Sequence, residues 1–362
     1  MNQHIESVVM QFDIPDGAWT VEPYGNGHIN ETYLVAAGEK RFILQRVNNY
    51  VFPRPEDVIE NIERVTAFLK GQIEREGGNP ERETLTLVKT HRNEHFAYDE
   101  QGGLWRMYLF IEDTISRDLP DTPELFELSG EAFGKFQRQM GDFPADSLHE
   151  TIHDFHNTPA RYRQLEDAIA RDEAGRLGNV SGEIAFCRQY EREVHTLLDA
   201  LERGEIPLRV THNDTKLNNV LLDAQTGRGV CVIDLDTVMP GLAAYDFGDS
   251  IRFGASTAPE DELDLSRVQL SLPMFEAFTH GFLKEAGQAL GAREIELLPM
   301  GAKLMTLECG MRFLADYLNG DKYFRVHREG HNLDRARTQF KLVRCMEENW
   351  AQMAEIVRRC AQ

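Results

Sequence analysis

The segments that favour β-strands fall in two separate parts of this 362-residue chain, and helix-forming sequence occupies most of the rest. β-Branched and aromatic residues near glycine turns predict strands over 18–23, 32–35, 41–47, 85–88 and 104–111. A second β-rich stretch covers 208–238, and a helix is predicted from Pro55. From Glu124 onward apolar residues recur at helical spacing, ending in one long helix with Phe340 and Val357 on the same face. This order predicts a mixed α/β (α+β) protein.

The predicted architecture has two lobes. Domains usually contain about 50–250 residues, so a chain of 362 residues exceeds the usual single core. The predicted boundary lies in the acidic linker 110–113, which divides the chain into a small β-rich lobe, 1–111, and a larger, mainly helical lobe, 112–362. The second lobe carries one β-hairpin within its β-rich stretch.

Composition excludes several classes of protein. A formal net charge of −21 would repel phosphate backbones and anionic membranes. The five cysteines are scattered and are expected to be reduced thiols, and the N-terminus has no signal-peptide pattern. No apolar run approaches the ~18 residues of a membrane span. We expect a cytoplasmic monomer that binds neither nucleic acid nor membrane.

The polar residues with the most informative spacing lie in the second β-rich stretch. The sequence Thr-His-Asn-Asp-Thr-Lys-Leu-Asn-Asn occupies 211–219. An apolar strand-like run over 230–233 then ends at Asp234, 20 residues after Asp214. The pattern His-x-Asp-x-Lys-x-x-Asn, followed by a strand that ends in an aspartate, is typical of a kinase catalytic loop and its metal-binding carboxylate.

These residue types suit phosphoryl transfer, which requires a proton acceptor, a cation near the γ-phosphate and oxygen ligands for Mg²⁺. Asp214 is predicted to accept the proton of the attacking hydroxyl, and Lys216 to stabilise the developing charge. Asn219 and Asp234 are predicted to hold Mg²⁺. A lone aspartate or asparagine is usually a turn residue, but the whole constellation favours function.

Three further aspartates require interpretation. Asp246-Phe247-Gly248 has the letters of the metal-binding tripeptide of protein kinases, but it lies 32 residues after Asp214, whereas Asp234 lies 20 residues after it and ends a strand. Asp246 is therefore interpreted as structural or as a residue that supports the metal ligands. Asp223 is expected to belong to the hairpin turn. Whether Asp236 contacts the metal stays open.

Five segments resemble the aminoglycoside phosphotransferase and choline kinase superfamily and, within it, the N-acetylhexosamine 1-kinases. The segments are 22–30, 211–219, 233–237, 246–250 and 308–317. The resemblance implies a protein-kinase-like two-lobed fold whose first lobe binds nucleotide. It also implies a Mg²⁺-dependent kinase that transfers a phosphoryl group from ATP to the anomeric 1-hydroxyl of N-acetylglucosamine or N-acetylgalactosamine.

The resemblance also implies site residues. The sugar would be contacted by His28, Asn30, Asp214, Arg312 and Tyr323. The nucleotide would lie near Gly25, Gly27, Gln45, Phe110 and Ile111, with the adenine bonded to the linker backbone. Simpler interpretations are that His28 and Asn30 are turn residues, that Arg312 pairs with Glu308 one helical turn earlier, and that Tyr323 is an ordinary aromatic residue.

One residue departs from the general kinase pattern. Gln45 stands in the third strand where a lysine usually contacts the α- and β-phosphates, which puts the phosphate contacts in doubt. Arg46 points to the other face of the strand and is an imperfect substitute. Two alternative functions stay open: a kinase of another small alcohol, such as choline, homoserine or a plain hexose, and, because of Gln45, a nucleotide-binding or regulatory pseudokinase.

Overall fold

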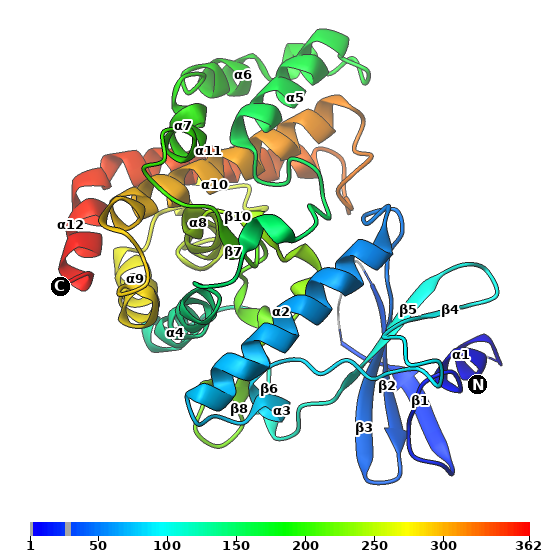
Figure 1. The fold of residues 1–362 in the computed structure, drawn as a ribbon. Helices are drawn as coiled ribbons and strands as arrows, with labels where there is room; N and C mark the ends of the chain where they lie inside the picture. The colour runs from blue at the N-terminus through cyan, green and yellow to red at the C-terminus, as the bar shows by residue number, and fades with distance from the viewer. Residues whose placement is uncertain (1–2, 26–29) are drawn as a thin grey trace. The chain divides into compact units, whose positions relative to one another are not determined.

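The computed structural model describes residues 3–25 and 30–362, and its chain forms two compact units (Figure 1). The first unit consists of Met1–Ile115, Asp142–His153 and Leu221–Met239, and the second of Ser116–Gly141, Asp154–Val220 and Pro240–Gln362. The first unit is rich in β-structure and the second is mainly helical, which confirms the predicted fold class. The predicted boundary after Ile111 stays a prediction.

The first unit is built on an antiparallel five-stranded sheet with the order β1-β2-β3-β5-β4. Its elements are α1 (Gln3–Val9), β1 (Trp19–Pro23), β2 (Glu31–Ala37), β3 (Lys40–Arg46), α2 (Pro55–Arg75), α3 (Pro80–Glu83), β4 (Ala97–Tyr98), β5 (Leu104–Leu109), β6 (Thr114–Ile115), β8 (Val220–Asp223) and β9 (Gly229–Val232). The last three form a separate sheet in the order β6-β8-β9. Four of the five strands predicted in the N-terminal part are confirmed as β1, β2, β3 and β5.

The sheet alternates between two faces. Val35, Phe42, Leu44 and Met107 are buried, and they pack with the apolar side of α1 in one core cluster. Because side chains alternate along a strand, Gln45 and its cross-strand partner Arg106 point to the opposite face. This opposite face carries the polar residues described below.

The prediction of a strand over 85–88 is wrong. Leu87 forms only an isolated bridge to Tyr108 of β5. Two backbone hydrogen bonds connect the segment to β5, from Val88 N to Met107 O at 2.8 Å and from Leu109 N to Thr86 O at 2.9 Å. β4 pairs with Trp105 and Leu104 at the other end of β5.

The second unit consists mostly of helices. Its elements are α4 (Pro123–Gln139), α5 (Thr158–Arg171), α6 (Ser181–Arg188), α7 (Thr196–Glu202), β7 (Arg209–Thr211), α8 (Ala243–Gly254), α9 (Leu272–Ala286), α10 (Ala292–Leu318), α11 (His331–Glu348) and α12 (Trp350–Cys360), and β10 (Met239–Gly241) lies at its border. A side chain at Gly130 of α4 or Gly281 of α9 would meet the backbone of the other helix, so only glycine permits this close contact. α4 and α9 therefore pack closely against each other.

The predicted long C-terminal helix is two helices. α11 ends at Glu348 and α12 begins at Trp350. The side-chain amide of the intervening Asn349 donates to the carbonyl of Cys345 at 2.8 Å, an alternative to continued helical bonding. The apolar periodicity continues across the break, which is why the sequence does not reveal it. None of the described helices is both long and apolar enough to cross a membrane.

Candidate active site

Hydrogen bonds to Asp246 of α8 hold the loop that follows β7. The Asp246 side chain is completely buried, and its two carboxylate oxygens accept the backbone N–H groups of His212 at 3.0 Å and Asn213 at 2.8 Å. Gln137 of α4 donates a third hydrogen bond at 2.7 Å. Burial raises the pKa of Asp246, and the charge of His212 and these hydrogen bonds oppose the rise. Asp246 therefore determines the path of the loop, as a structural residue does.

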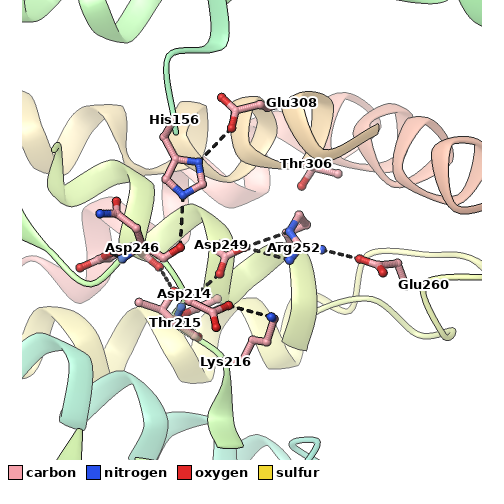
Figure 2. A network of polar contacts seen from close by, with 12 residues as sticks. His156, Asp214, Thr215, Lys216, Asp246, Asp249, Arg252, Glu260, Thr306 and Glu308 are labelled. Carbon is pink, nitrogen blue, oxygen red and sulfur yellow. Dashed lines mark hydrogen bonds and ion pairs between the residues drawn. The ribbon is translucent and has the colours of Figure 1, made fainter. Parts of the chain in front are cut away.

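A second aspartate of α8 continues this support (Figure 2). Asp249 accepts the backbone N–H of Thr215 at 3.1 Å and two hydrogen bonds from Arg252 at 3.0 and 2.9 Å. Arg252 also donates to Glu260 at 2.8 Å. Burial acts to raise the pKa of Asp249, but the positive charges of Arg252 and Lys216 outweigh burial and lower it. The Asp249 carboxylate, which supports the loop, therefore stays charged.

The structure brings together three of the predicted site residues. Lys216 Nζ lies 2.7 Å from Asp214 Oδ1, and Asn219 Nδ2 donates to Asp214 Oδ2 at 3.1 Å and to the Asp214 carbonyl at 2.8 Å. The charge of Asp214 is the main cause of the raised pKa of Lys216, against the opposing effect of burial. Asp214 is about one quarter exposed, so a ligand can reach a carboxylate that is already oriented by two neighbours.

His156 supports the same loop from a distant part of the sequence. Its Nδ1 lies 2.9 Å from Glu308 of α10, and its Nε2 lies 3.3 Å from the carbonyl of Asn213 (Figure 2). Thr158 donates to the second oxygen of Glu308 at 2.8 Å. Asn213 has a positive φ of 65°, so this contact stabilises a strained backbone position. Neither His156 nor Glu308 was predicted, because no local sequence pattern connects them.

Arg312 does not form the helical ion pair that its spacing from Glu308 allowed. Among the described residues, the Glu308 carboxylate instead contacts His156 and Thr158. The Arg312 guanidinium instead lies against three aromatic rings. Its Cζ is 5.2 Å from the ring centre of Phe155, 6.0 Å from that of Tyr323 and 5.6 Å from that of Phe324. An arginine on aromatic faces keeps its in-plane N–H donors for a ligand.

A second guanidinium lies close to Arg312. Arg161 of α5 donates from Nε and Nη2 to the carbonyl of Phe155, at 3.2 and 3.0 Å. Burial, followed by the positive charge of Arg312, lowers the pKa of Arg161.

The segment containing Tyr323 is fixed by Asp316, which accepts the Tyr323 N–H at 2.9 Å. Tyr323 is 52% exposed, so it is not a core aromatic residue.

In the first unit, Gln45 and Asn30 belong to one polar cluster. Arg106 donates to Gln45 Oε1 from Nε at 3.1 Å and from Nη2 at 2.8 Å. Arg106 Nη1 lies 2.5 Å from Asp236 Oδ1, and Asn30 donates to Asp236 Oδ2 at 2.7 Å. Arg106 was not predicted, although a charge within the apolar strand Leu-Trp-Arg-Met-Tyr-Leu is itself a signal.

The remaining predicted residues of the first unit lie on turns and in the linker. Asp234 follows β9 and has a positive φ of 60°. Gly25 has a φ of 73°, a conformation that favours glycine, while Gly27 and His28 lie outside the described residues. Phe110 N donates to the carbonyl of Arg41 at 3.0 Å, and the carbonyl of Ile111 accepts a hydrogen bond from Thr114 at 2.9 Å.

Comparison with known proteins agrees with this geometry. A family model described as "Phosphotransferase enzyme family" matches residues 20–284. An aminoglycoside phosphotransferase from Alicyclobacillus acidocaldarius shares 12% identity, with 98% of this chain and 96% of that chain covered and a TM-score of 0.60. Choline kinase from Cryptosporidium parvum shares 13% identity, with 96% and 94% covered and a TM-score of 0.56.

A spectinomycin phosphotransferase solved with ADP and spectinomycin shares 14% identity, with 99% of this chain and 97% of that chain covered and a TM-score of 0.51. At these identities the structural likenesses establish a common fold. The family model covers well over half of the chain, including β1–β3 and the loop from His212 to Asn219. The chain belongs to the phosphotransferase enzyme family.

Proposed function

We propose that this protein transfers the γ-phosphoryl group of ATP to the anomeric hydroxyl of an N-acetylhexosamine such as N-acetylglucosamine or N-acetylgalactosamine. The observation that carries the phosphotransferase part is the position of the Asp214 carboxylate, which contacts Lys216 and Asn219. The loop that contains it is held by hydrogen bonds to buried carboxylates. A carboxylate that is oriented before substrates bind suits a catalytic role, which supports the proposal.

Asp214 is the proposed proton acceptor. Asn219 and Lys216 each engage one of its oxygens, so the carboxylate presents a fixed direction to an incoming hydroxyl. As the hydroxyl oxygen bonds to the γ-phosphorus, its proton passes to Asp214, and the bond from the γ-phosphorus to the bridging oxygen of ADP breaks. ADP leaves with that electron pair, and negative charge remains on the transferred phosphoryl oxygens. Lys216 is then released from part of its attraction to Asp214 and stabilises that phosphoryl charge.

Mg²⁺ is the proposed metal, with Asn219 and Asp234 as its ligands. The Asn219 amide nitrogen is committed to Asp214, which leaves the amide oxygen for a cation. Amide and carboxylate oxygens are the ligands that Mg²⁺ prefers, so the donor types fit. When bound there, the ion would neutralise negative charge on the phosphates.

The linker after β5 is the proposed adenine contact. Phe110 N and Ile111 O are already hydrogen-bonded within the protein. Among the residues described, no hydrogen bond involves Phe110 O or Ile111 N. These two groups belong to one trans peptide and point in opposite directions, so only one of them can meet the edge of adenine. Phe110 O would accept from the adenine amino group, or Ile111 N would donate to a ring nitrogen.

The sugar preference is supported by Arg312 and Tyr323, together with the resemblance to N-acetylhexosamine 1-kinases. A neutral sugar is recognised through directional hydrogen bonds, and Arg312 offers donors that no described carboxylate occupies. Arg161 places a second positive charge nearby, which disfavours a cationic acceptor such as choline. His28 and Asn30 are proposed to complete the sugar contacts.

The test is an ADP-release screen with N-acetylglucosamine, N-acetylgalactosamine, glucose, galactose, choline and homoserine. We expect an N-acetylhexosamine to give the highest kcat/KM, because sites built to bond a polar substituent reject analogues that lack it. Choline as the best acceptor would reject the sugar assignment and leave the phosphotransferase assignment intact. No ADP release with any acceptor, from protein that binds ADP, would favour a nucleotide-binding pseudokinase.

A further inference from the structure

Position 45 of β3 has no phosphate-binding lysine, but Arg106 of the neighbouring strand β5 places a positive charge on the same face of the sheet. Gln45 of β3 stands directly opposite Arg106 of β5 in the antiparallel register. The two side chains share two hydrogen bonds, both to Gln45 Oε1. The Gln45 amide nitrogen donates to Thr32 of β2 at 3.1 Å, which fixes its orientation and directs its oxygen toward Arg106.

Arg106 has little opportunity to contact a ligand itself. Its side chain is 1% exposed. Nε and Nη2 bond to Gln45, Nη1 forms the ion pair with Asp236, and the ring of Tyr108 lies 5.2 Å from the guanidinium carbon. A phosphate would have to displace these partners, so Arg106 acts through other residues.

Asp236 is similarly committed. One carboxylate oxygen pairs with Arg106, the other accepts the Asn30 amide at 2.7 Å, and the side chain is only 5% exposed. The Asp236 carbonyl accepts a hydrogen bond from Thr151 at 3.2 Å. A metal ion would have to reach this almost fully buried carboxylate and compete with Arg106 and Asn30 for its oxygens.

Asn30 receives its orientation from this pair. Its amide nitrogen is held by Asp236, and its amide oxygen accepts the backbone N–H of Asn48 at 3.1 Å. The amide is therefore fixed at both ends. Its exposure is intermediate, so it can meet a ligand where Arg106 and Asp236 cannot.

We propose that Arg106 and Asp236 are positioning residues that organise this face in place of the missing lysine: Arg106 fixes Asp236, and Asp236 fixes Asn30 for the acceptor. In this arrangement Gln45 orients Arg106 and does not contact phosphate, and Asp236 is not a magnesium ligand. The proposal rests on the proposed function, since it assigns Asn30 to the acceptor. It differs from a lysine at position 45, which would contact the nucleotide itself.

The decisive variant is Asp236→Asn. Its amide oxygen can still face Arg106, but its amide nitrogen then meets the Asn30 amide nitrogen, and two donors cannot bond each other. Asn30 must turn, so we expect the KM of the best acceptor to rise about tenfold, a typical effect of losing one hydrogen bond in a site. We expect the KM of ATP and the affinity for ADP, measured by calorimetry across a Mg²⁺ titration, to change less than about twofold.

Two further variants sharpen the test. Asn30→Ala should raise the acceptor KM by a similar factor, and adding Asp236→Asn to it should have no further effect, because both changes remove the same interaction. Gln45→Lys places a second positive charge beside Arg106, so we expect a lower Tm and no gain in ADP affinity. Asn30→Ala removes a partly exposed side chain, so it keeps the test available if Asp236→Asn does not fold.

Three results would overturn the proposal. A higher Mg²⁺ requirement for ADP binding by Asp236→Asn would make Asp236 a metal ligand. Tighter ADP binding by Gln45→Lys would show that position 45 contacts phosphate. Additive effects in the double variant would show that Asp236 does not act through Asn30. The first two results are calorimetric and do not depend on which acceptor is used, whereas failure of the proposed function would appear as absent turnover in the unmodified protein.

Discussion

Lys216 lies 2.7 Å from Asp214, and this pair joins the proposed proton acceptor to the cation that is proposed to stabilise the transferred phosphoryl group. The contact has a consequence for both residues. Before substrates bind, each neutralises the other, and both are held at the surface of the loop. An attacking hydroxyl and a phosphoryl group would then meet partners that need little rearrangement.

Asp214→Asn is expected to lower kcat by at least ~100-fold, because it keeps the shape of the side chain and removes the proton acceptor. Binding of sugar and nucleotide should change far less. The measurement is steady-state kinetics together with calorimetric ADP binding. Turnover near that of the unmodified protein would reject Asp214 as the base.

Asp234→Ala and Asp246→Ala are expected to have opposite phenotypes. Asp234→Ala should abolish Mg²⁺-dependent turnover in folded protein. Asp246→Ala leaves two buried N–H groups of the loop without an acceptor, at about 1–3 kcal/mol of unfolding free energy each, so it should mainly lower the Tm. Thermal unfolding and Mg²⁺ titrations of both variants distinguish these outcomes, and a reversed pair of phenotypes would assign the metal to Asp246.

Arg312→Ala is expected to raise the KM of the sugar about tenfold or more, since it removes donors to a polar substrate, while the KM of ATP stays near its starting value. Arg344→Ala is the matched control. Arg344 is also an arginine against an aromatic ring, 5.1 Å from that of Phe186, but it lies on α11 and is not assigned to the site. Equal loss of ATP and sugar binding in Arg312→Ala would make Arg312 structural.

The alkaline limb of the pH–rate profile should not report Lys216 below about pH 10.4, the ordinary value for lysine. Its pKa is raised, mainly by Asp214, so the charged form persists as pH rises through the ordinary value and is lost only above it. The stabilising contribution of the Lys216–Asp214 pair is therefore complete below the ordinary lysine pKa, and it is lost as pH rises through the raised pKa of Lys216. Kinetics from pH 7 to 10, with Lys216→Arg as the comparison, would detect an earlier loss that contradicts this.

Local sequence patterns predict the parts of the fold that depend on neighbours in the chain. Alternation of β-branched residues identifies β1, β2, β3 and β5, and helical spacing identifies α2. The segment 85–88 has the same composition as a strand, but pairing depends on which edge of β5 is free. Three separate segments of the chain make up the first unit, and this arrangement depends on tertiary contacts and not on the periodicity of the sequence.

The candidate site likewise contains contacts that local sequence predicts and contacts that it does not predict. The spacing of Asp214, Lys216 and Asn219 within one short segment predicts their contact, and the structure contains it. His156 and Glu308 are 152 positions apart, so nothing local connects them. The spacing of Arg312 and Glu308 allows a helical ion pair, but the partly buried His156 and the buried Thr158 occupy that carboxylate.

The most direct test of the central claim is phosphorus and proton NMR of the product formed from ATP and N-acetylglucosamine. The account predicts that the phosphorus is coupled to the anomeric proton, that ADP forms in equal amount, and that Asp214→Asn yields neither product within the same time. Phosphorus on the 6-hydroxyl, or ATP hydrolysis without any sugar phosphate, would contradict it.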